Sequence, residues 1–85
     1  MNLSIEEKAI AINLAMNIDQ GNIDLNEVVN VFAENFNDAY QIINFWKSIV
    51  DESPMIKDVL EQLHEKFTLE MQRSKLEKNL LVLLI

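Results

Sequence analysis

Residues 16–27 read MNIDQGNIDLNE and contain the only glycine of the 85-residue chain. Gly21 suits the left-handed position just after a helix, because it lacks the Cβ atom that makes this conformation costly. Asp24 and Glu27 stand three residues apart, which is the spacing of a capping box at the start of a second helix. The stretch therefore predicts a corner between two helices.

The same stretch resembles part of the calcium-binding loop of EF-hand proteins. With Gly21 at the sixth of the twelve loop positions, Asp24 and Glu27 fall on the ninth and twelfth, which supply ligands in that family. The first and third positions are Met16 and Ile18, whose side chains offer no oxygen atom. The resemblance covers seven residues and lacks the ligand-rich half of the loop. We therefore expect no calcium site and favour the corner.

Helical periodicity extends to the N-terminal side of this corner. A first helix is expected from about residue 5 to residue 19, after a capping box formed by Ser4 and Glu7. Its apolar positions reach nearly all the way round, so we expect this helix to be central in the fold. Its main apolar stripe consists of Ile5, Ala9, Ile12 and Met16, with Ile10 and Leu14 beside it.

Three further helices are expected after the corner. The second runs to about residue 35, and Asn37 or Asp38 caps the third. Ser53 and Pro54 suit the N-cap and first position of a fourth helix, which meets no later glycine or proline. This helix is either bent near residues 72–75 or faces different neighbours along its two halves. The expected apolar side of the second helix is Leu25, Val28, Val29, Phe32 and Phe36. That of the third helix is Ala39, Ile42, Ile43, Trp46, Ile49 and Val50, and that of the fourth begins with Ile56, Leu60, Leu63, Phe67 and Met71.

The predicted fold is an all-α single domain over residues 1–85. It comprises an acidic three-helix part at 1–53 and a long C-terminal helix at 54–85. At ~1.5 Å per residue the long helix could reach ~45 Å, about twice the length of the first helix, so its far end would overhang a monomeric bundle. We therefore expect homodimerisation to complete the bundle, the alternatives being a frayed tail or a tail that folds back. The dimer surface is assigned to Leu69, Leu76, Leu80 and Leu83.

Charge is distributed unevenly along the chain. The net charge is −7, and residues 1–52 hold nine acidic and two basic side chains, whereas residues 53–85 hold five of each. Direct binding to nucleic acid is therefore not expected, because it needs clustered Lys and Arg. No segment approaches the roughly 20 apolar residues of a membrane span, and the N-terminus lacks signal-peptide features. We expect a cytoplasmic protein.

Catalytic and metal-binding residues are sparse in this sequence. Absence of cysteine excludes disulfides and thiol catalysis, and one glycine cannot build a phosphate-binding loop. Glu61 and His64 have the Glu-x-x-His spacing found in di-iron bundles, and Glu34 could add a carboxylate. A metal-dependent oxidase that uses Glu61 and His64 across a dimer is therefore one alternative. We favour a histidine at the edge of an apolar stripe, and expect no catalytic residue, cofactor or bound metal.

The remaining features favour recognition of another protein. Residues 9–46 contain no Lys or Arg, and Tyr40 and Phe45 fall off the main apolar stripe of their helix. We predict a non-catalytic protein-interaction module, such as a regulator, an adaptor or a chaperone-like subunit. The other alternative is an acidic inhibitor that mimics nucleic acid on a basic partner surface. The candidate partner-binding residues are Glu27, Glu34, Asp38, Tyr40 and Phe45.

Overall fold

The computed structural model describes residues 3–74 of the chain, and all regular secondary structure within this range is helical. The all-α prediction is confirmed, whereas completion of the bundle by a second copy stays a prediction. The described elements are α1 (Ile5–Asp19), α2 (Leu25–Glu34), α3 (Phe36–Ile49), the short 3-10 helix η1 (Val50–Glu52) and α4 (Pro54–Ser74).

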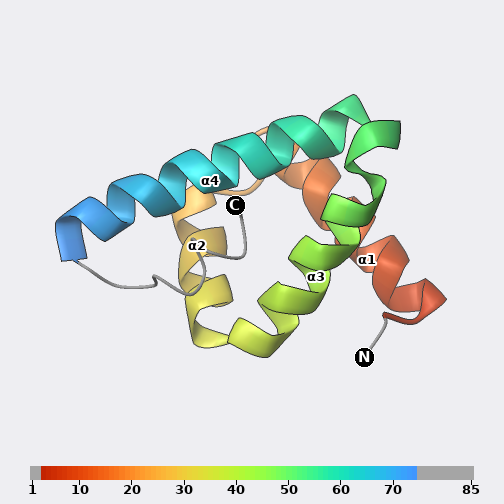
Figure 1. Cartoon of the computed structure of the whole chain (residues 1–85), viewed down its shortest axis with the longest axis horizontal. Coiled ribbons are helices and arrows are strands. Elements are labelled where there is room, and N and C mark those ends of the chain that lie inside the picture. Colours follow the sequence, from red (N-terminus) through yellow and green to blue (C-terminus); the bar gives the residue numbers. More distant parts are fainter. Residues whose placement is uncertain (1–2, 75–85) are drawn as a thin grey trace.

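Helix α4 is the longest described element and organises the packing. It contacts α1, α2 and α3, and Figure 1 shows it running along one side of the molecule above the other helices. Its 21 residues span ~31 Å at ~1.5 Å per residue, close to the longest dimension of 35 Å. As predicted, Ser53 caps it, since Ile56 N donates to Ser53 Oγ at 3.4 Å. Its buried side consists of Ile56, Val59, Leu63 and Phe67.

The predicted corner between the first two helices is present. Gly21 has a φ of +74°, and its N–H donates to the Ile18 carbonyl at 3.1 Å, which ends α1. The Asp24 carboxylate accepts from Asn26 N at 3.0 Å and so caps α2. The capping box predicted between Asp24 and Glu27 is wrong in detail, because Glu27 N donates to the Asp24 backbone carbonyl instead.

The junction between α2 and α3 is shorter than predicted. Asn35 alone separates the two helices, and both its backbone N–H and its side-chain Nδ2 donate to the Val31 carbonyl at 3.0 Å. Because Asn35 itself satisfies the end of α2, α3 begins at Phe36 rather than after Asn37 or Asp38. Phe36 therefore lies in the first turn of α3 and is partly exposed, instead of extending the apolar side of α2.

Trp46 occupies the centre of the core. It is fully buried, its ring lies 6.3 Å from that of Phe32 between centroids, and its Nε1 donates to the Ala11 carbonyl at 3.1 Å. A buried indole N–H needs an acceptor, and Ala11 and Ala15 are small enough to let α3 approach the α1 backbone. Trp46 thus selects the alanine side of α1 as the buried side.

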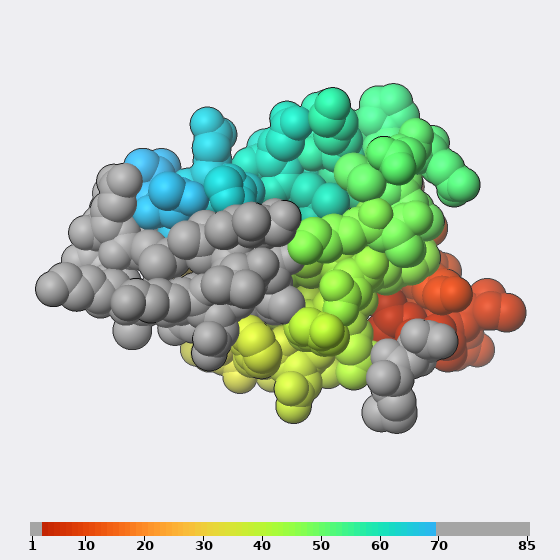
Figure 2. All heavy atoms as spheres, viewed as in Figure 1, coloured from red at the N-terminus to blue at the C-terminus, as the bar shows by residue number. Residues whose placement is uncertain are grey.

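The side of α1 that was predicted to face the core is the wrong one. Its buried residues are Ala11, Ala15 and Ile18, whereas Ile5, Ile12 and Met16 are 86%, 37% and 41% exposed. Figure 2 shows the start of α1 at one edge of the molecule. The stripe expected to enter the core therefore lies at the surface, because the two alanines on the other side permit closer packing on Trp46.

Candidate protein-binding surface

The exposed apolar side of α1 is the most distinctive surface of the described chain. We name Ile5, Ala9, Ile12 and Met16 the α1 stripe; their spacings of four, three and four residues place them along one side of the helix. All four are exposed, and no residue from 9 to 18 carries a charge. The result is a ridge about three turns long on which a partner could bury apolar area.

The first turn of α1 is fixed by a reciprocal capping box. Ser4 Oγ accepts from Glu7 N at 3.1 Å, and Glu7 Oε1 accepts from Ser4 N at 2.9 Å. The pKa of the Glu7 carboxyl lies below its ordinary value of 4.5, mainly because of the hydrogen bond with the Ser4 backbone N–H and to a smaller extent because of the Ser4 hydroxyl. The stripe therefore begins on an ordered helix end and not on a fraying one.

A hollow with two aromatic side chains, named the aromatic hollow, lies between the start of α1 and α3. It has a volume of about 420 Å³, and Tyr40 and Phe45 line it together with Lys8. Lys8 Nζ lies 5.7 Å from the centroid of the Phe45 ring, close enough for a cation–π contact. The structure thus brings the two aromatic candidates from the sequence to one place, and Tyr40 is largely exposed there.

The three acidic candidates lie along α2 and the start of α3. Glu34 and Asp38 line one open hollow of about 430 Å³ at the α2–α3 junction. Glu27 lines a separate hollow of about 180 Å³ with Ile23 and Val31. Glu27 and Glu34 are seven residues apart, so they share the outward side of α2. These acids form a loose row instead of a single pocket.

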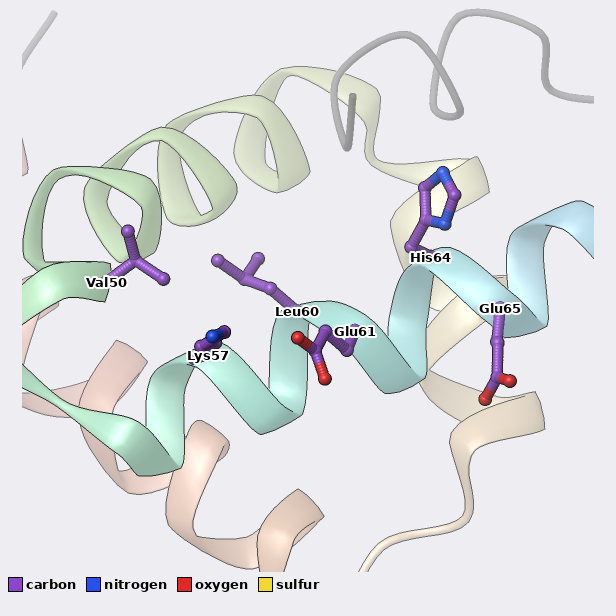
Figure 3. A pocket seen from close by; sticks show the side chains of 6 residues that line it. All are labelled: Val50, Lys57, Leu60, Glu61, His64 and Glu65. Atoms are coloured by element: carbon purple, nitrogen blue, oxygen red, sulfur yellow. The ribbon is translucent and has the colours of Figure 1, made fainter.

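Glu61 and His64 lie on α4 beside an open hollow of about 500 Å³, shown in Figure 3. The His64 ring and the Glu61 carboxylate point in different directions in that view, and Glu34 lines another hollow. Within residues 3–74 no group of three or more His, Cys, Asp or Glu side chains is placed to hold a metal ion. An oxidase built on these residues would need ligands from a second copy.

The predicted dimer surface is only partly described. Leu69 is 55% exposed on α4. Leu76, Leu80 and Leu83 lie outside the described residues, and so does the part of the predicted 54–85 helix that follows Ser74. The bend predicted near residues 72–75 falls at the limit of the described residues and stays a prediction.

Comparison with known proteins gives no relative from which a role could be transferred. No protein-family model, curated protein or solved structure matches the chain. Among the described helices, none is both long enough and apolar enough to cross a membrane.

Sequence reasoning missed the α1 stripe as a surface because it assigned those residues to the core. Bulky apolar residues at helical spacing are usually the buried ones, which made Ile5, Ile12 and Met16 the obvious choice. The signal that favoured the other side was the pair Ala11 and Ala15, four residues apart, in a chain with one tryptophan to place. Small residues at that spacing allow a large aromatic side chain to pack close to a helix backbone.

Proposed function

We propose that this chain is a small helical protein-interaction module without chemistry of its own, and that it binds through the α1 stripe. The observation that carries the proposal is the exposure of Ile5, Ile12 and Met16 along one side of an ordered helix. Contiguous apolar surface is costly in water and commonly marks an interaction site. An uncharged ridge of this kind suits helix-in-groove or helix-to-helix recognition.

The rigidity of α1 supports this role. The capping box holds its first turn, and the bond from Trp46 Nε1 to the Ala11 carbonyl holds its middle against α3. A preorganised helix loses little conformational entropy when it binds, so a modest apolar area contributes more net affinity. The stripe is therefore presented in a form that is ready to pack.

The aromatic hollow extends the proposed surface. Lys8 lies on the turn of α1 between Ile5 and Ala9, and its ammonium lies over Phe45 of α3. A partner seated on the stripe could reach Tyr40, whose ring and hydroxyl offer one apolar and one polar contact. Tyr40 and Phe45 thus remain the proposed aromatic anchors.

Site-specific photo-crosslinking tests the proposal. A benzophenone amino acid at position 12 should link the chain to one discrete protein species in cells, because Ile12 is in the middle of the stripe. The matched control carries the same group at position 30, where Asn30 is exposed on α2. Combining Ile5→Gln with Met16→Gln should abolish the link from position 12. Equal labelling patterns from positions 12 and 30 would refute binding through the stripe.

A second candidate function is inhibition of a basic partner by mimicry of nucleic acid. The row formed by Glu27, Glu34 and Asp38 supports it, since Glu34 and Asp38 share a hollow and Glu27 follows the same side of α2. Reversing all three charges to Lys should then abolish binding to that partner, and raised salt should weaken it. Binding that is insensitive to both changes rules this candidate out.

A further inference from the structure

We propose that the α1 stripe is occupied by α1 of a second copy of this chain, packed antiparallel about a two-fold axis. This inference rests on the proposed function and names its partner. It assigns self-association to α1, whereas the sequence-based prediction assigns it to Leu69, Leu76, Leu80 and Leu83 of the C-terminal helix. The two assignments can be separated by experiment.

The stripe is self-complementary in an antiparallel register. When residue i faces the residue whose number is 21 minus i, Ile5 lies opposite Met16 of the second copy, and Ala9 lies opposite Ile12. The small Ala9 side chain leaves room for the β-branched Ile12 of the other helix. Two-fold symmetry repeats each contact, as expected of an isologous interface. A parallel arrangement would instead place Ile12 against Ile12 and leave Ala9 against Ala9.

Charge also favours a second copy over a basic partner. The chain carries a net charge of −7, so two copies repel each other through most of their surface, but residues 9–18 bear no charge. One edge of the stripe is formed by Glu6, Asn13 and Asn17. In the antiparallel pair the edge with Glu6, Asn13 and Asn17 on one copy lies next to the same edge of the second copy. Because the two helices run in opposite directions, Glu6 then lies beside the neutral Asn17 of the second copy. A basic partner would find no acidic side chain along residues 9–18.

The size of the surface predicts a weak dimer. Fifteen residues of α1 extend ~22 Å, and one helix presents a width of ~10 Å, so the footprint lies well below the ~800 Å² per partner of a standard stable interface. We therefore expect a dissociation constant on the order of 10⁻⁴ M. Measurements must cover protein concentrations on both sides of this value.

Thiol crosslinking tests the register directly, because the chain has no cysteine of its own. Full-length Glu6→Cys and Asn17→Cys chains are mixed in equal amounts at several hundred micromolar and treated with a short bismaleimide. The antiparallel pair brings positions 6 and 17 of different copies together and keeps like positions more than two helical turns apart. The mixed 6–17 product should then far exceed half of all crosslinked dimer, which is the share that random collision gives.

Two sets of full-length variants serve as controls. Ile5→Gln with Ile12→Gln should reduce the mixed product at least fivefold. The circular dichroism spectrum should stay unchanged and the melting temperature at low micromolar concentration should fall by a few degrees at most, because Ile5 is 86% and Ile12 37% exposed. Leu76→Gln, Leu80→Gln and Leu83→Gln together should leave the mixed product unchanged. The opposite pattern, with loss only in the C-terminal variant, would overturn the α1 assignment in favour of the C-terminal helix.

Failure of this inference differs from failure of the proposed function. A random product ratio, or an excess of 6–6 and 17–17 products, would overturn antiparallel self-pairing. If position 12 still crosslinks to a different protein in cells, the stripe remains a binding surface and only its assigned occupant is wrong. If position 12 links to nothing beyond the position 30 control, the proposed function fails as well.

Discussion

The same substitution on two sides of α1 should have very different consequences for stability. Ala15 is fully buried in the same core cluster as Trp46, whereas Ala9 belongs to the exposed α1 stripe. Leucine is a good helix former at both positions, so helix propensity does not distinguish Ala15→Leu from Ala9→Leu. Any difference in stability between the two variants therefore reports which side of α1 faces the core.

The expected magnitude follows from the packing around Trp46. Extra methylene groups in a well-packed core cost about 1–3 kcal/mol. Displacing α1 would also break the 3.1 Å bond from Trp46 Nε1 to the Ala11 carbonyl, a further loss of about 1 kcal/mol. Ala15→Leu should thus lower the free energy of unfolding by about 2–4 kcal/mol, or the melting temperature by roughly 10–25 °C. Ala9→Leu should change it by no more than about 0.5 kcal/mol.

Urea unfolding at low micromolar concentration, where self-association is negligible, provides the assay. Far-ultraviolet circular dichroism follows the helices, and the emission of Trp46, the only tryptophan, follows the core. In Ala15→Leu the native emission should shift to longer wavelength, because the indole loses its dry surroundings. If Ala9→Leu were the more damaging variant, the α1 stripe would face the core and both the proposed function and the dimer register would fall.

Three further outcomes follow from local geometry. Trp46→Phe should lower the free energy of unfolding by about 2 kcal/mol, since it removes the hydrogen bond to the Ala11 carbonyl and part of the core volume. The shift of the urea midpoint measures this loss. Gly21→Ala should lower the free energy of unfolding by about 1 kcal/mol. The φ of +74° disfavours any residue with a Cβ, although no other side chain or distant backbone atom lies within 4 Å of the place a Cβ would take. An equal urea midpoint for the variant and the unmodified chain would contradict this. Ser4→Ala should move the pKa of Glu7 toward 4.5, as the hydroxyl that helps to lower it is lost; carbon NMR titration of the carboxyl measures the change. Because the folded pKa of Glu7 is the lower one, its contribution to stability is present above pH 4.5 and disappears as the pH falls through the folded pKa. The stability difference between the two chains should shrink there but persist, since Ser4 Oγ also accepts from Glu7 N, a bond that does not depend on the charge of Glu7.

Local chemistry was readable from the sequence at three helix boundaries, although the Asp24–Glu27 capping box and the start of α3 were not predicted correctly. Ser4 with Glu7, Gly21 after α1 and Ser53 before Pro54 each set a helix boundary through hydrogen bonds or backbone geometry within a few residues. For α4 the sequence placed Ile56, Leu63 and Phe67 correctly on the buried side, but it chose Leu60, which is only partly buried, and missed Val59, which is fully buried. Helix number, helix class and most of the boundaries therefore followed from short-range rules.

The rotation of α1 was decided only by the tertiary structure. This helix has apolar residues on several sides, so its own sequence does not rank the stripe of Ile5, Ile12 and Met16 against Ala11 and Ala15. The choice depends on Trp46, 35 positions from Ala11 along the chain, whose ring needs close approach and whose N–H needs a buried acceptor. When Trp46 packs on the alanine side and donates to the Ala11 carbonyl, the larger apolar residues of α1 face the solvent. The surface proposed for binding is therefore a consequence of how the core is packed.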